Sequence, residues 1–143
     1  MKINDVAKYL IYLACEDKIY LLTPLKLQKL LYYSQGLSFV WDNKELFKEE
    51  FEAWQYGPVN REVYLQYRKY GEYQIPYIEG KIFSSPKDEI NTIKAVWRDF
   101  KKFNAYELVE MTHIEGPWKE AYSSENYRIS NASIKKYFKR VYA

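Results

Sequence analysis

Apolar residues recur at helical spacing along most of the chain, and this pattern predicts its main elements. A first apolar stripe follows Asn4, a candidate N-cap, and predicts a helix over about residues 4–16. A second helix is expected from Thr23, which can cap it, through Pro24, which suits the first helical position, to Trp41. Because its leucines recur on one side, we expect one face of this second helix to look inward.

Shorter segments follow, and they include the main strand signal in the sequence. Residues 51–55 alternate between apolar and polar side chains and predict a short strand, for which residues 46–47 are the candidate partner. We expect the next helix to begin with Gly57 as its cap and Pro58 as its first residue. Gly71 is expected to end that helix.

The second half of the chain carries four further helix starts. Residues 73–83 contain proline and glycine and predict a loop or a weak hairpin. Helices are then predicted after the capping candidates Ser85 and Asn104, at the Gly116-Pro117 pair, and after Ser130. The sequence therefore predicts a mainly α fold, a compact helical bundle with a minor short β-hairpin.

Composition limits the possible functions without naming one. At 143 residues the chain is expected to form a single domain, residues 1–143, and its net charge of +3 does not indicate a nucleic-acid-binding protein. No apolar run approaches the ~20 residues that span a bilayer. The single cysteine, Cys15, lies in the first apolar stripe, where it is expected in the core and fits a reducing compartment. We therefore expect a cytoplasmic protein without disulfides.

Catalysis and metal binding find weak support among the titratable residues. His113 is the only histidine, so a structural zinc site lacks ligands, and a hydrolase based on His113 and Glu115 stays a minor alternative. Glu49, Glu50 and Glu52 are close in sequence, but a solvated strand and turn of mixed charge explains them better than a cation site. We predict no enzyme, no cofactor and no metal.

The 16 tyrosines are the most unusual part of the composition, and tyrosine is favoured where proteins bind proteins. Three of them recur every third residue on the helix expected after Pro58, with arginine donors beside them. Packing of the same tyrosines against the last helices is an equally weighted alternative. We predict a partner-binding surface formed by Tyr56, Tyr64, Tyr67, Arg68, Tyr70 and Tyr73.

The end of the chain is the only locally basic segment. Lys135, Lys136, Lys139 and Arg140 lie on the last predicted helix, where they could contact phosphates. A phage- or plasmid-associated regulator that binds DNA through this helix is therefore the alternative function, although a nucleic-acid partner is not expected.

Three blocks in order resemble one known family. They are Thr23–Gly36, Phe51–Val59, and Leu108–His113 followed by Gly116–Trp118. Together they are similar to the Panacea domain of the SocA-like antitoxins and of the phage-associated protein GepA. The ordered combination covers nearly the whole chain and is more specific than any block alone.

The resemblance implies a mostly α-helical antitoxin that binds and neutralises a toxin encoded beside it, on a chromosome, plasmid or prophage. Some related proteins act as adaptors that deliver the toxin to a Clp-type protease. Many carry an added helix-turn-helix domain, and because the first block starts at residue 23 we expect no such domain before it. The remaining polar residues of that block are expected to be satisfied inside or at the edge of the core. They are Gln28, Tyr32, Tyr33 and Gln35.

Overall fold

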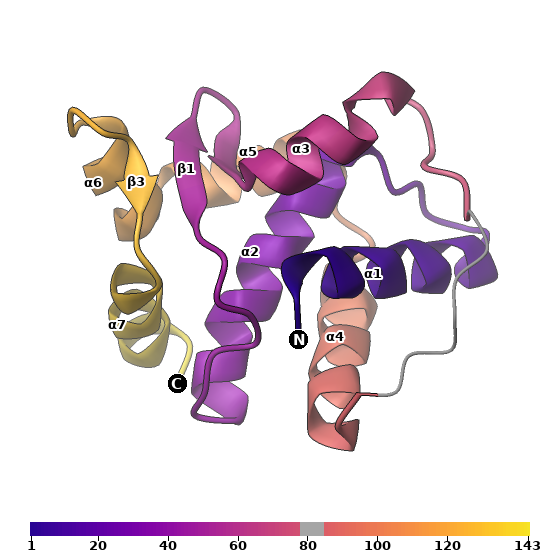
Figure 1. The fold of residues 1–143 in the computed structure, drawn as a ribbon, viewed down its shortest axis with the longest axis horizontal. Coiled ribbons are helices and arrows are strands. Elements are labelled where there is room, and N and C mark those ends of the chain that lie inside the picture. Colours follow the sequence, from indigo (N-terminus) through magenta and orange to yellow (C-terminus); the bar gives the residue numbers. More distant parts are fainter. Residues whose placement is uncertain (78–84) are drawn as a thin grey trace.

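Helix α2 (Pro24–Trp41) runs through the middle of the molecule, and the other helices are arranged around it (Figure 1). The computed structural model describes residues 1–77 and 85–143. The predicted mainly α fold with a small β element is confirmed. The helices around α2 are α1 (Ile3–Asp17), α3 (Arg61–Tyr67), the 3₁₀ turn η1 (Arg68–Tyr70), α4 (Lys87–Phe100), α5 (Ala105–His113), α6 (Gly116–Tyr122) and α7 (Asn131–Val141).

Helix α2 begins as predicted but is buried more completely than expected. The Thr23 hydroxyl accepts the backbone N–H of Lys26 at 3.4 Å, and Pro24 is the first helical residue. Every side chain from Lys26 to Phe39 is buried, so the prediction of a single inward face was too narrow. Neighbours on all sides remove α2 from water, and its polar side chains therefore need partners inside the protein.

Two buried glutamines of α2 hold the backbone of the segments packed against it. Gln28 accepts the N–H of Asn60 at 2.9 Å and donates to the carbonyl of Asn60 at 3.1 Å. Gln35 accepts the N–H of Leu46 at 2.8 Å and donates to the carbonyl of Phe47 at 2.7 Å. These amides act like the edge of a neighbouring strand, and the expectation that both are satisfied in the core is confirmed. The same expectation was wrong for Tyr33, whose buried hydroxyl has no hydrogen-bond partner among the described residues.

The sheet has three antiparallel strands in the order β2-β1-β3. Strand β1 (Phe51–Trp54) pairs with β2 (Gly57–Val59) and with β3 (Arg128–Ile129). The prediction that β1 pairs with residues 46–47 was wrong, because Gln35 already binds the backbone groups of that segment. Strand β3 was not predicted, because its two residues are too few to show a pattern.

The start of α3 differs from the prediction for a conformational reason. Gly57 has a φ of +102° and begins β2 directly after the two-residue turn at Gln55 and Tyr56, so Pro58 lies in a strand. The cap is instead Asn60, whose side chain accepts the N–H of Val63 at 3.1 Å. At the other end the prediction is confirmed, because Gly71 follows η1 with a φ of +58°.

Two other predicted caps were also misplaced. Asn4 lies inside α1, which begins after Lys2, and the Asn4 side chain donates to Glu62 of α3 at 2.6 Å. Helix α4 begins after Pro86, which has no capping side chain, and Ser85 does not cap it. In both places the polar residue stands near the helix start but outside the capping position.

The starts of the last three helices are confirmed. Asn104 and Glu107 form a reciprocal capping box at α5, and Ser130 accepts the N–H of Ser133 at the start of α7. Helix α6 begins at Gly116 with proline in its first turn. Of the loop or weak hairpin predicted over 73–83, residues 78–83 lie outside the described residues.

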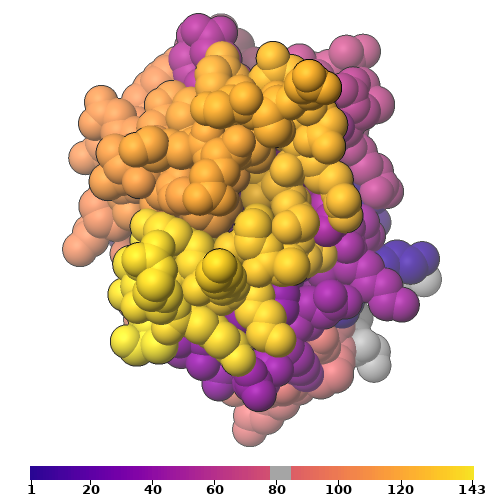
Figure 2. Space-filling model, turned by 90° about the vertical axis from the view of Figure 1, so that its left-hand side faces the viewer, coloured from indigo at the N-terminus to yellow at the C-terminus, as the bar shows by residue number. Residues whose placement is uncertain are grey.

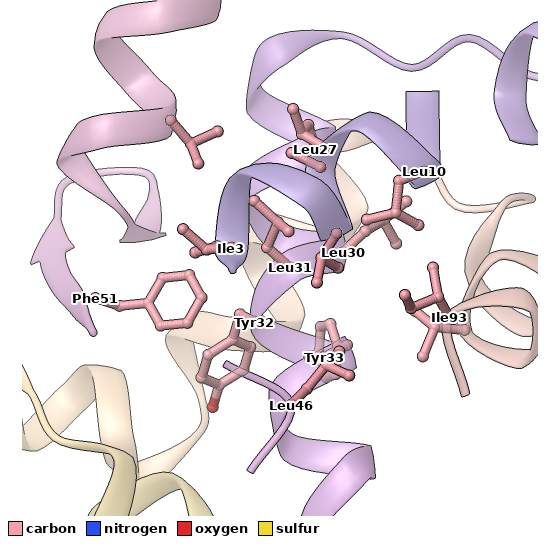
Figure 3. Close-up of a cluster of buried hydrophobic side chains, with 14 of the residues drawn as sticks. Ile3, Leu10, Leu27, Leu30, Leu31, Tyr32, Tyr33, Leu46, Phe51 and Ile93 are labelled. Carbon is pink, nitrogen blue, oxygen red and sulfur yellow. The ribbon is translucent and has the colours of Figure 1, made fainter. Parts of the chain in front are cut away.

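The hydrophobic core lies on both sides of α2, between α1 and α4 on one side and the sheet and α7 on the other (Figure 1). Cys15 is only half-buried at its margin. Within the described ranges no helix is both long and apolar enough to cross a bilayer. Figure 3 shows the central side chains Ile3, Leu10, Leu27, Leu30, Leu31, Tyr32, Tyr33, Leu46, Phe51 and Ile93.

Candidate functional site

The structure divides the predicted tyrosine surface into two parts. Tyr67 is only 7% exposed and belongs to the core, so it separates its neighbours on the surface. Tyr56 and Tyr64 lie exposed beside the sheet. Tyr70 and Tyr73 follow the end of α3, where Tyr73 is exposed and Tyr70 packs partly against the core. Arg68 is exposed at the junction. The stripe is therefore not continuous, and what its exposed members bind stays a prediction.

Tyr64 belongs to a group of ordered side chains on the outer side of β1. Its ring centroid lies 4.8 Å from that of Trp54, edge to face, and the guanidinium of Arg61 lies 5.4 Å from the Trp54 ring. Glu52 accepts hydrogen bonds from Arg61 at 3.1 and 3.2 Å and from the Trp54 indole at 3.0 Å. The bonds from Arg61 and then Trp54 lower the pKa of Glu52. The group is thus fixed before any partner binds.

A second aromatic group lies against the same strand from α5, α6 and β3. The Trp118 indole donates to the carbonyl of Trp54 at 2.8 Å. The rings of His113 and Tyr122 stack on either side of Trp118, at centroid distances of 4.0 and 4.6 Å, and Tyr127 contacts Tyr122. This face carries α6 and β3 in orange above α7 in yellow (Figure 2).

We call these rings the aromatic cluster. The C-terminal part of the cluster was not predicted, because the pairing of β1 with β3 brings together segments that are far apart in the chain. A sequence signal was present, since aromatic residues recur around the Gly-Pro helix start. The members of the cluster are Trp54, Tyr56, Tyr64, Trp118, Tyr122 and Tyr127.

The second part of the predicted surface borders a groove at the other end of α3. The backbone N–H of Ile75 donates to Leu22 at 3.0 Å, and Leu22 donates to the Gln74 side chain at 2.6 Å, which holds this segment beside the α1–α2 loop. The groove has a volume of about 490 Å³ and runs between that loop and the start of α5. Its lining includes Ile19, Leu21, Lys26, Gly71, Phe103 and Tyr106.

The two residues of the hydrolase alternative serve separate structural contacts. Glu115 is buried and accepts hydrogen bonds from the hydroxyls of Tyr32 at 3.0 Å and Tyr142 at 2.5 Å. Burial raises the pKa of Glu115, although the bonds from Tyr142 and Tyr32 oppose that rise. His113 Nε2 lies 2.9 Å from the carbonyl of Gln55. The carboxylate thus joins α6 to α2 and α7, while the imidazole supports the β1–β2 turn.

The glutamates near β1 also have structural partners. Glu49 accepts the backbone N–H of Ile3 at 3.3 Å, and Glu50 accepts the Arg128 side chain at 2.7 Å, which ties β3 to the segment before β1. Among residues 1–77 and 85–143, no three carboxylate, histidine or cysteine side chains are grouped as metal ligands. The side chains predicted as the basic face of α7, Lys135, Lys136, Lys139 and Arg140, are exposed.

Comparison with known proteins identifies a family. The model of the family described as "Antitoxin SocA-like, Panacea domain" matches residues 27–119, which hold most of α2, strands β1 and β2, and α3 to α5. Antitoxin SocA of Caulobacter vibrioides (strain NA1000 / CB15N) is 32% identical over 109 residues, which are 68% of this chain and 58% of that protein. The chain thus spans less than two thirds of the relative's length, and no solved structure matches it. The chain belongs to the SocA-like antitoxin family with the Panacea domain.

Proposed function

We propose that this protein is a non-enzymatic antitoxin that neutralises a cognate protein toxin by binding it directly. The observation that carries the proposal is membership of a family described as antitoxins, together with 32% identity to a protein named as one. The separate structural contacts of His113 and Glu115 support a binding role over a catalytic one.

The aromatic cluster is the proposed toxin-binding surface. Tryptophan, tyrosine and arginine contribute most to interface hot spots, and all three meet where Trp54, Arg61 and Tyr64 contact each other. Because these rings are already held by one another and by Glu52, little side-chain entropy remains to be lost on binding. Tyr56 extends the exposed area beyond the turn.

Co-expression with the protein encoded by the neighbouring gene tests this proposal. Tyr64→Asp and Tyr56→Asp should each abolish protection from the toxin, because a charge would be buried in the complex without a partner. Val141→Asp is the matched control, since it places the same charge on an exposed apolar position of α7. Circular dichroism should show unchanged helix content in all three variants. Persistent toxicity beside soluble wild-type protein would contradict the proposal.

Delivery of the bound toxin to a Clp-type protease is a second form of the same proposal. The toxin's half-life would then shorten when the antitoxin is present, and protection would disappear in a host without the protease. Protection that persists in that host, with an unchanged toxin half-life, would assign neutralisation to blocking alone.

The exposed basic side chains of α7 support the alternative of a DNA-binding regulator. A gel-shift titration with the protein's own promoter over a salt series tests it, because phosphate contacts weaken steeply with salt. The alternative predicts that replacing Lys135 and Lys136 with glutamine reduces binding and flattens the salt dependence.

A further inference from the structure

The floor of the groove holds the buried ammonium group of Lys26. Lys26 is 4% exposed, and its Nζ donates to the backbone carbonyl of Lys101 at 2.5 Å. The same nitrogen lies 5.9 Å from the ring centroid of Tyr20 and 5.5 Å from that of Trp97. An ammonium has three N–H donors, and the carbonyl of Lys101 takes only one of them in a hydrogen bond, so Lys26 keeps donor capacity for another acceptor.

The charges around Lys26 do not supply that acceptor. Asp17 is bound to the Lys101 side chain at 2.9 Å. Glu107 is engaged in the capping box of α5, and both acids attract Lys26 only at longer range. Burial outweighs them and lowers the pKa of Lys26 to about 8. A carboxylate entering the groove would therefore meet a poorly compensated cation.

The rim of the groove is apolar and exposed. Ile19 is 76% exposed and Leu21 is 64% exposed, while the neighbouring Leu22 is buried and fixes the loop that carries them. Tyr106 is exposed on the opposite side, where its hydroxyl donates to Glu72 at 3.4 Å. A small molecule could fill the groove, but it would leave these outward-facing side chains in water. A polypeptide would cover both the groove and its rim.

We propose that this groove binds a segment of a partner polypeptide in which a carboxylate adjoins large apolar side chains. The carboxylate pairs with the Lys26 ammonium, and the apolar side chains pack against Leu21 and Phe103. This site goes beyond the proposed toxin contact. In Figure 1, β1 and α6, which carry Trp54, Trp118 and Tyr122, lie on one side of α2 and the end of α1 lies on the other, so we expect the two sites to be occupied independently.

Selection from a random library of short peptides displayed on phage tests the proposal with the full chain immobilised. The recovered peptides should carry Asp or Glu beside a large apolar residue. Leu21→Asp should remove their binding, because it places a negative charge on the apolar rim. Lys26→Met keeps the length and apolar stem of the side chain, and it should weaken binding about tenfold and remove the preference for acidic residues. Leu65→Asp, on exposed α3, is the matched control and should bind like the wild type.

Four outcomes would overturn the proposal, provided that thermal melts show each variant folded. Recovered peptides could lack acidic residues, or they could bind wild type and Leu21→Asp equally. Binding of decanoate in the groove without any peptide selection would assign the site to a small apolar acid. Sedimentation of the wild type as a dimer that Leu21→Asp dissociates would assign it to a second copy of this chain.

Discussion

The Lys29 ammonium lies wholly inside the protein, where it donates to the carbonyl of Pro58 at 2.9 Å. It sits beneath the turn at Gly57, close to the hydroxyl of Thr112. Burial lowers the pKa of Lys29 to about 7. A protonated, charged Lys29 side chain costs folding free energy at this position, so the stability of the fold depends on whether its Nζ is protonated.

This cost predicts how Lys29→Met changes the response of stability to pH. Between pH 7 and the ordinary lysine pKa of 10.5, the unfolded chain holds more protons at Lys29 than the folded one does, so wild-type stability rises with pH. Relative to Lys29→Met, the wild-type unfolding free energy should rise by up to about 1.4 kcal/mol per pH unit in that range.

Urea denaturation at several pH values measures this difference. Lys8→Met, on the exposed side of α1, is the control and should follow the wild-type curve. Parallel curves for wild type and Lys29→Met would show that Lys29 keeps an ordinary pKa in the folded protein.

At the scale of single residues, roles that depend on neighbours in the sequence were predictable, and roles that depend on contacts with distant segments were not. Thr23 and Asn104 cap as expected because a cap depends on residues three positions away. The bonds of Gln28 to Asn60 and of Gln35 to Phe47 depend on which segments α2 meets, and no local pattern encodes that. Tyr67 illustrates the same limit, since spacing placed it on a stripe and packing placed it in the core.

At the scale of the elements, helices α2 and α7 pack closely against each other at Gly36, which has no side chain to hold them apart. A Cβ on Gly36 would overlap the ring of Phe138, which is fully buried. The Phe138 ring also contacts those of Tyr32 and Tyr33, at centroid distances of 5.4 and 5.9 Å. The absence of a side chain at Gly36 therefore lets α7 pack directly onto α2.

Gly36→Ala should consequently destabilise the protein although alanine favours helices. The gain in helix propensity is about 1 kcal/mol, whereas overpacking a core costs about 1–3 kcal/mol or more when a rigid ring cannot yield. Gly116→Ala is the matched control, because its Cβ would meet Tyr137 at an ordinary 3.5 Å. Thermal unfolding should show a lower Tm for Gly36→Ala only. Equal Tm values would mean that Phe138 moves freely.

The observed helices and strands agree closely with the sequence prediction where the periodic segment is long, and less closely where it is short. Helices of three or more turns were found near their predicted bounds, because many residues together define the helical period. The hairpin partner was wrong, because a three-residue strand has no period and its place is set by the turn at Gly57. Of the candidate site, Tyr56 and Tyr73 are exposed and what they bind stays a prediction, while the groove arises from loop packing that only the structure reveals.

For the whole molecule, the aromatic cluster and the groove are expected to act separately. Tyr64→Asp should lose toxin neutralisation but keep the selected groove peptides, and Leu21→Asp should show the opposite. Toxin co-expression and fluorescence anisotropy with a labelled peptide measure the two activities on the same variants. Loss of both activities in either folded variant would show that a single partner covers both ends.

The burial of α2 from Lys26 to Phe39 also bears on how long the protein persists in a cell. Removing any covering element would expose a helix that carries Lys29 and a row of leucines, so partly unfolded states are costly and unfolding should be cooperative. Proteases that cut only unfolded chains would then act on the fraction of molecules set by the global unfolding equilibrium. Small changes in folding free energy anywhere around α2 would set the protein's turnover and, under the proposed function, the margin between the amounts of this protein and its toxin.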